Sequence, residues 1–322
     1  MNNALPYKTK QFFFVLIKLS IVVGAFYFIY NKLTNNKVLD FSVFIDFLTK
    51  NDVFSTKNIL LLLFFSFLNW LFEIYKWKTL VASVKKISFL EALKQSLGSL
   101  TASLFTPNRI GEYGAKAIYF FKTERKRVLL LNLISNMMQM SITLIFGIIG
   151  FIFFISQYDV EINYFKISRG FLLVVVILGL SAFGIKQNKY RIKGFSFEKI
   201  KAFTTKLPIK ITLLGFLFSL TRYFIFSFQF YFLLHIFKID LSYFDAMLFI
   251  TSMYLLASII PSIFIFDVVV KGSIAVYLFS FAHINELTIL CITTIMWLLN
   301  FVLPSIFGSY YVLNFNFVKD ND

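Results

Sequence analysis

The stretch "TPNRIGEYGAKA", residues 106–117, lies within a long apolar region and places a proline, two glycines and three charged residues close together. Proline lacks a backbone donor and clashes with the preceding turn, so Pro107 predicts a break between two helices rather than one continuous helix. Gly111 and Gly114 are expected to permit close approach of neighbouring backbone. The stretch therefore predicts that the apolar region 88–121 folds as a helical hairpin.

The composition around this stretch is that of an integral membrane protein. Hydrophobic residues make up 58% and charged residues 15% of the 322 residues, and the mean hydropathy is +0.77. Soluble domains are less apolar and more charged than this. The net charge of +16 comes from basic residues gathered between apolar runs. We interpret this pattern as membrane topology and exclude nucleic acid as a partner. The single cysteine, Cys291, excludes a disulfide framework.

The apolar runs predict the number of membrane crossings, since a helix needs about 20 apolar residues to span a bilayer core. The segments 122–127 and 186–210 are strongly basic, which assigns them to the cytoplasmic side together with both termini. The expected location is therefore the cell membrane, in a multi-pass arrangement. Six runs are long enough or nearly so: 12–30, 58–80, 128–155, 170–185, 211–237 and 287–313.

An internal repeat divides the chain into two halves. "SFLEAL" at 88–93 matches "SYFDAM" at 242–247, and 242 minus 88 gives the same offset, 154, as Pro261 minus Pro107. The first three apolar runs, shifted by this offset, nearly overlay the last three, but the second copy starts on the opposite side of the membrane. We therefore expect an all-α single membrane domain with two inverted-topology repeats, 1–160 and 161–322. It has six spanning helices and two re-entrant broken-helix hairpins, 88–121 and 242–281.

Broken helices at matching places in inverted halves are typical of the binding site of a transporter. In both halves an acidic residue precedes a lysine by four residues, which places the two side chains on one helix face as an ion pair. The alternative is that these pairs only hold the hairpins together. The residues concerned are Arg109, Glu112 and Lys116 after the first break, and Asp267 and Lys271 after the second.

Polar stripes on three spanning helices predict a shared hydrated interior. Arg222 lies near the middle of its apolar run and is expected to face Glu73; charge at this depth is a candidate functional site. The alternative for Glu73 and Lys76 is that they snorkel to the cytoplasmic interface. The stripes are Ser219, Arg222 and Gln229; Asn69, Glu73 and Lys76; and Asn132, Asn136 and Gln139.

The sequence offers no metal site, no cofactor site and no catalytic signature. His235 and His283 are the only histidines, and neither lies in a metal-binding or catalytic motif. We therefore do not expect an enzyme. The alternative is a membrane-embedded lipid-modifying enzyme in which Glu112 or Asp267 acts as general base.

The two proline segments resemble the paired motifs of a flippase-like family named after the transmembrane region of lysylphosphatidylglycerol synthase. Thr106, Pro107, Arg109, Gly111, Glu112 and Lys116 fit the first motif. In the second, Val269 and Lys271 stand where the family more often has glycine and arginine, and arginine offers a bidentate phosphate grip that lysine does not. The resemblance covers roughly residues 10–315.

The resemblance implies translocation of a lipid headgroup between leaflets. The chain ends soon after its last apolar run, so we expect a stand-alone membrane module without a synthase domain. The expected substrate is an anionic or zwitterionic lipid, either a phospholipid or a polyprenyl-phosphate carrier. Enzymes of lipid-glycan or envelope biosynthesis are the protein partners that this implies. A further alternative is a non-transporting partner of a lipid-glycan synthase.

Overall fold

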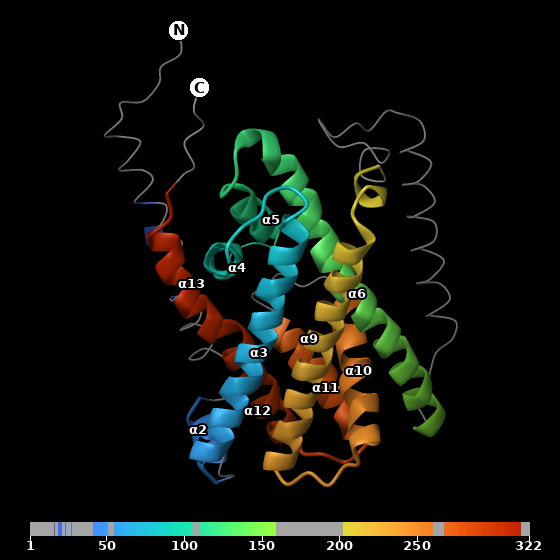
Figure 1. The fold of residues 1–322 in the computed structure, drawn as a ribbon. Helices are drawn as coiled ribbons and strands as arrows, with labels where there is room; N and C mark the ends of the chain where they lie inside the picture. The colour runs from blue at the N-terminus through green and yellow to red at the C-terminus, as the bar shows by residue number, and fades with distance from the viewer. Residues whose placement is uncertain are drawn as a thin grey trace, which may run out of the picture.

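The computed structural model describes residues 41–50, 55–104, 106, 110–158, 202–259 and 267–316, with five scattered positions between 16 and 27. Every element in these ranges is a helix, as expected (Figure 1). The elements are α2 (Phe41–Lys50), α3 (Thr56–Val81), α4 (Phe89–Ser103), α5 (Ile110–Ala117), α6 (Lys122–Gln157), α9 (Ile209–Ile236), α10 (Tyr243–Ile259), α11 (Asp267–Ser280), α12 (Glu286–Trp297), the π-helical segment η3 (Leu298–Val302) and α13 (Leu303–Leu313).

Four helices are long and apolar enough to cross a membrane: α3, α6, α9 and the continuous helix Glu286–Leu313 formed by α12, η3 and α13. They confirm four of the six expected spans. The runs 12–30, apart from five positions, and 170–185 lie outside the described residues. Helix α6 begins at Lys122, earlier than the expected span 128–155. The basic residues 122–127 were expected to precede the span, but they form the first turns of this helix. The protein is thus a multi-pass, all-helical membrane protein.

Both proline-containing regions consist of two short helices, as expected. In the first region α4 ends at Ser103 and α5 begins at Ile110. In the second, α10 ends at Ile259 and α11 begins at Asp267. Pro107 and Pro261 themselves lie outside the described residues. At about 1.5 Å per residue none of the four helices reaches about 30 Å, so none can span the bilayer alone.

The matching hexapeptides form the same helix start in both halves. Ser88 caps α4: its hydroxyl accepts from Glu91 N at 3.2 Å, and its backbone N–H donates to Glu91 Oε2 at 2.7 Å. That backbone hydrogen bond holds the pKa of Glu91 below its ordinary value. Ser242 caps the start of α10 in a similar way: its hydroxyl accepts from Asp245 N at 3.1 Å and donates to Asp245 Oδ2 at 2.6 Å. A shared capping function therefore accounts for the serine and acid of the matched segments.

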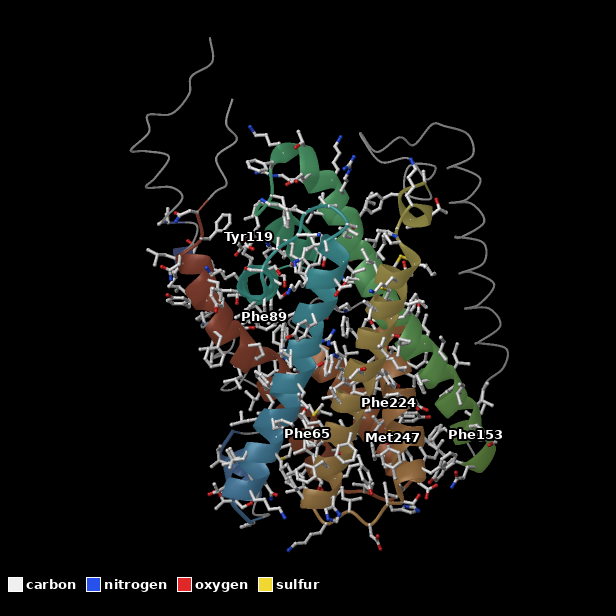
Figure 2. All side chains as sticks on the ribbon, in the orientation of Figure 1. Phe65, Phe89, Tyr119, Phe153, Phe224 and Met247 are labelled. Atoms are coloured by element: carbon white, nitrogen blue, oxygen red, sulfur yellow. The ribbon has the colours of Figure 1, made fainter. Side chains whose placement is uncertain are left out.

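Helices α3 and α9 pack antiparallel along their whole length. Leu62 O accepts from Gln229, Asn69 Oδ1 accepts from Arg222, and the Phe72 ring lies beside that of Phe218. Phe65, labelled in Figure 2, lies between the two helices with its ring centroid 5.4 Å from that of Phe228. The Asn69–Arg222 contact lies near the middle of both helices.

The first helix of each hairpin packs against the last long helix of the other half, α4 on α13 and α10 on α6. Figure 1 shows these hairpins at opposite ends of the bundle, α4 and α5 beside the end of α3, and α10 and α11 beside the end of α9. Both contacts are made through glycine, since a Cβ at Gly308 would overlap the Leu97 carbonyl and one at Gly150 would overlap Thr251. Phe153, on the outer side of α6 in Figure 2, is 49% exposed and is suited to face lipid.

Gly308→Ala is expected to lower the free energy of unfolding by about 1–3 kcal/mol, because the added methyl group overpacks the contact between α4 and α13. Thermal unfolding in detergent measures the effect. Gly114→Ala is the matched control, since nothing lies within 4 Å of a Cβ at that helical position. Equal melting temperatures for the two variants would contradict the close approach at Gly308.

Candidate functional site

The expected contact between Arg222 and Glu73 is present at the interface of α3 and α9. Arg222 Nη1 donates to Glu73 Oε2, and Lys76 Nζ reaches the same oxygen atom at 2.8 Å. Lys76 is 1% exposed, so it does not snorkel to an interface. Two cations therefore converge on one carboxylate oxygen inside the helical bundle.

Neighbouring polar groups fix the direction of the Arg222 guanidinium. Nε donates to Asn69 Oδ1 at 3.0 Å and to the Asn69 carbonyl at 3.2 Å. Nη1 also donates to Gln139 Oε1 at 3.2 Å, and Gln139 Nε2 donates to the Ser219 carbonyl at 3.3 Å. No described residue accepts from Nη2, and the side chain is 16% exposed. This leaves one edge of the guanidinium for a ligand.

A helix irregularity brings a further polar residue, Asn300, into this network. Pro304 has no backbone N–H, so the Asn300 carbonyl receives no bond from the residue four positions later, and the helix is π-helical over Leu298–Val302. That carbonyl instead accepts from Trp70 Nε1 at 2.9 Å. The Asn300 amide accepts from Asn69 at 2.8 Å and donates to Gln229 at 2.8 Å. The network thus links α3, α9 and η3.

Lys116 forms the expected ion pair with Glu112, at 2.8 Å. Its ammonium lies in a buried cage formed by Glu112, Asn132 and Trp77. Its Nζ also donates to Asn132 Oδ1 at 2.9 Å and lies 4.4 Å from the centroid of the Trp77 ring. The three N–H groups of an ammonium thus have three acceptors, one of them a π face. Gln95 orients the ring by accepting from Trp77 Nε1 at 2.7 Å. Lys116 is fully buried, so its ammonium group is saturated in this conformation.

The described charges of the site do not cancel. Arg222, Lys76 and Lys116 are cations, while Glu73 and Glu112 are the carboxylates that neutralise them. These five residues alone therefore have a net charge of +1. Such an excess in a low-dielectric interior favours an anionic ligand. Among the same residues, no three His, Cys, Asp or Glu side chains are arranged to hold a metal ion.

One hydrophobic group joins the described end of α4 to the described start of α11. Leu104, at the end of α4, packs with Trp297 and Val302, and Val268 at the start of α11 packs against the same group. Lys271 lies one turn further along α11 and is partly buried, with a polar or ionic partner. Asp267 begins α11, but its side chain, like the whole of Arg109, lies outside the described residues. The structure therefore brings the two broken regions together.

The two glycines of the opening stretch differ. Gly111 is packed closely, since its N–H donates to Thr106 Oγ1 at 2.8 Å and a Cβ would lie 2.8 Å from Thr106 Cγ2. The expectation for Gly114 was wrong, because nothing lies within 4 Å of a Cβ there. Gly114 faces away from the neighbouring helices that Gly111 approaches.

Four further residues of the site were not among the candidates from sequence: Trp70, Trp77, Gln95 and Asn300. Asn300 had a local signal, because it lies four residues before Pro304 in an apolar run, where its carbonyl must lose a helical hydrogen bond. Trp77 and Gln95 had none, since Trp77 meets Lys116, and Gln95 meets Trp77, only through tertiary packing. The polar stripes on α3, α6 and α9 had identified Asn69, Asn132 and Gln139 in advance.

Comparison with known proteins gives one match. The sequence model of the family described as the lysylphosphatidylglycerol synthase TM region matches residues 15–308. No curated protein matches the chain, and no solved structure does. The match extends over nearly the whole chain and confirms the resemblance inferred from the proline motifs. The chain is therefore a member of the lysylphosphatidylglycerol synthase transmembrane-region family, a membrane module associated with lipid handling.

Proposed function

We propose that this protein moves an anionic or zwitterionic lipid, a phospholipid or a polyprenyl-phosphate carrier, between the leaflets of the cell membrane by alternating access. The observation that carries the proposal is the group of Arg222, Glu73 and Lys76, two cations on one carboxylate, buried where α3 meets α9. Ionised groups at this depth are costly and mark a pathway or a site. A phosphate headgroup would supply the missing negative charge, while the lipid tails stay in the bilayer.

Arg222 is the proposed first contact of the phosphate, because its Nη2 edge has no described partner. Nη2 has two N–H groups, and each can donate a charge-assisted hydrogen bond to a phosphate oxygen. Arg109 and Lys271, from the two hairpins, are proposed to complete the cationic set, while Glu112 and Asp267 balance it. Lys116 would join only after a rearrangement, since its three donors are engaged. We propose transport rather than catalysis for this set.

We also propose that the two halves are inverted repeats with six spanning helices and two re-entrant hairpins. Three observations support this. Helices α3 and α9, which the offset of 154 relates, pack antiparallel about the Asn69–Arg222 contact. The offset also relates the two capped helices, α4 and α10. Each of these packs on the last long helix of the other half. Rocking of two such halves about a shared site is the usual basis of alternating access.

The orientation that we propose places the basic start of α6 in the cytoplasm. This segment contains Lys122, Lys126 and Arg127. Figure 1 shows it at the same end of the bundle as residues 202–208, which precede α9, and as the end of α13. Lys206 and Lys210 add positive charge at this end. The positive-inside bias supports a cytoplasmic C-terminus.

Reconstitution into vesicles that contain a fluorescent phosphatidylglycerol tests the transport proposal. We expect the wild-type protein to speed exchange of the label between leaflets, measured by the fraction that a membrane-impermeant quencher reaches with time. The double variant Arg109→Ala plus Arg222→Ala is expected to lose about tenfold or more of this rate, because charge-assisted phosphate contacts are worth about 1.5–3 kcal/mol each.

Lys210→Ala is the matched control, since this lysine lies on the same helix as Arg222 and is exposed. It is expected to retain the wild-type rate. Thermal unfolding of each variant before reconstitution shows that it is folded. Unchanged leaflet exchange in a folded double variant would contradict the proposed site.

A further inference from the structure

A second polar group lies between α3 and α6, beside the Glu73 contact. It consists of Lys76 on α3 and of Asn132 and Ser135 on α6, three residues apart and therefore on one face of that helix. Lys76 Nζ lies 3.5 Å from the Ser135 carbonyl. All three side chains are at least nine-tenths buried.

The group has more hydrogen-bond donors than the protein satisfies. Asn132 Nδ2 and Ser135 Oγ are fully buried and have no partner among the described residues. Lys76 uses one N–H on Glu73 and a second, at the limit of hydrogen-bond distance, on the Ser135 carbonyl. An ammonium has three donors, so one remains. Unsatisfied buried polar groups in a native fold call for a specific explanation.

The orientation of Asn132 is fixed by its neighbour. Its Oδ1 accepts from the Lys116 ammonium at 2.9 Å, and the opposite orientation would place an NH₂ group against an NH₃⁺ group. The two Nδ2 N–H groups are therefore donors without a partner among the described residues, available to a ligand. Together with the Lys76 ammonium and the Ser135 hydroxyl, these N–H groups form a set of hydrogen-bond donors. The only acceptor left in this group is the Ser135 Oγ atom.

Charge and hydrogen bonding together select the class of ligand. Lys76 and Lys116 both lie at this group, so a cationic group is repelled. An oxyanion accepts several hydrogen bonds and supplies the charge that the site lacks. We propose that Lys76, Asn132 and Ser135 form a second phosphate-binding subsite, adjacent to the one at Arg222.

This inference rests on the proposed function and deepens it, because two adjacent phosphate subsites suit a lipid headgroup that has two phosphates. The same donors would also bind free phosphate that enters with a monophosphate lipid. The shared chemistry is a phosphate oxyanion, and the two sources are separated by experiment.

The experiment compares farnesyl diphosphate, farnesyl monophosphate and inorganic phosphate as ligands of the full chain in detergent, by titration calorimetry. If the second phosphate belongs to the lipid, the wild-type protein binds the diphosphate about tenfold or more tightly than the monophosphate, in line with one or two charge-assisted hydrogen bonds. If it is a free anion, inorganic phosphate binds to the wild-type protein and the two lipids bind equally.

Two variants test the subsite in either case. Asn132→Asp keeps the oxygen that Lys116 needs but replaces the donors by a repelling carboxylate, and Ser135→Ala removes one hydroxyl. Both are expected to abolish most of the diphosphate preference, or the binding of inorganic phosphate. Ser135→Ala leaves the charge of the site unchanged, so its monophosphate binding is expected to stay within about twofold of wild type. Ser141→Ala is the matched control, since that hydroxyl bonds to the Met137 carbonyl of its own helix at 2.8 Å.

The subsite is overturned if Ser135→Ala and Ser141→Ala have equal effects and Asn132→Asp changes neither the diphosphate preference nor the binding of inorganic phosphate. That result would indicate bound water only. Failure of the proposed function looks different. In that case labelled lipid does not cross the vesicle membrane, although phosphate binding still depends on Asn132 and Ser135.

Discussion

Glu73→Ala is expected to lower the free energy of unfolding by about 3–5 kcal/mol, the cost typical of removing one partner from a buried ion pair. The variant leaves Lys76 and Arg222 close together without the carboxylate oxygen that both contact. Lys76 is the more deeply buried of the two, so it bears most of the desolvation cost. Unfolding in mixed micelles with increasing sodium dodecyl sulfate measures the loss.

Companion variants separate the charge effect from loss of packing. Glu73→Gln keeps the volume and one acceptor oxygen, so its cost is expected to come from the missing charge alone. Lys76→Met in the Glu73→Ala background removes one of the two stranded cations and is expected to recover part of the stability. Phe67→Ala on the same helix is a control for general loss of side chain, because this residue is 63% exposed.

A Glu73→Ala protein as stable as the wild type would show that water or lipid reaches both cations, and the low-dielectric argument for the site would then fail. The double variant gives a second criterion. Because Glu73 and Lys76 share a contact, their effects must be non-additive. Additive losses would contradict the 2.8 Å ion pair between them.

Much of the site could be predicted from sequence because its residues follow helical spacing. Glu112 and Lys116 are four residues apart, so a helix places them on one face wherever the segment lies. The contact between Glu73 and Arg222 was predicted by a different argument. Polar stripes on apolar helices are expected to face each other rather than lipid. Both contacts are present in the structure. Helical periodicity thus predicts which side chains face inward.

Contacts that depend on tertiary geometry could not be predicted in this way. Trp77 lies on α3 and Lys116 on α5, and the ring meets the ammonium only because tertiary packing brings these two helices together. Asn300 reaches Asn69 across 231 positions of the chain. Its availability depends on the π-helical segment before Pro304. Hydropathy also located the apolar core of α6 but not its start, since charged residues continue the helix beyond the bilayer.

Lys116→Met is expected to lower the free energy of unfolding by about 3–5 kcal/mol, which makes Lys116 a structural anchor in this conformation. The ammonium contacts Glu112, Asn132 and the Trp77 ring. Methionine approximates the length of lysine, so the loss reflects these contacts rather than a cavity. The fluorescence of Trp77 is expected to change as well, because a cation no longer lies over its ring.

Lys94→Met provides the matched control, since Lys94 is exposed on α4 and a surface substitution changes stability by about 0.5 kcal/mol or less. The comparison also separates the two functions that a basic residue near a lipid site can have. If Lys116→Met is as stable as Lys94→Met but fails to move labelled lipid, Lys116 contacts the headgroup and the cage opens during transport. If Lys116→Met unfolds at much lower denaturant concentration, the cage holds α3, α5 and α6 together, and the phosphate contacts are left to Arg222 and its neighbours.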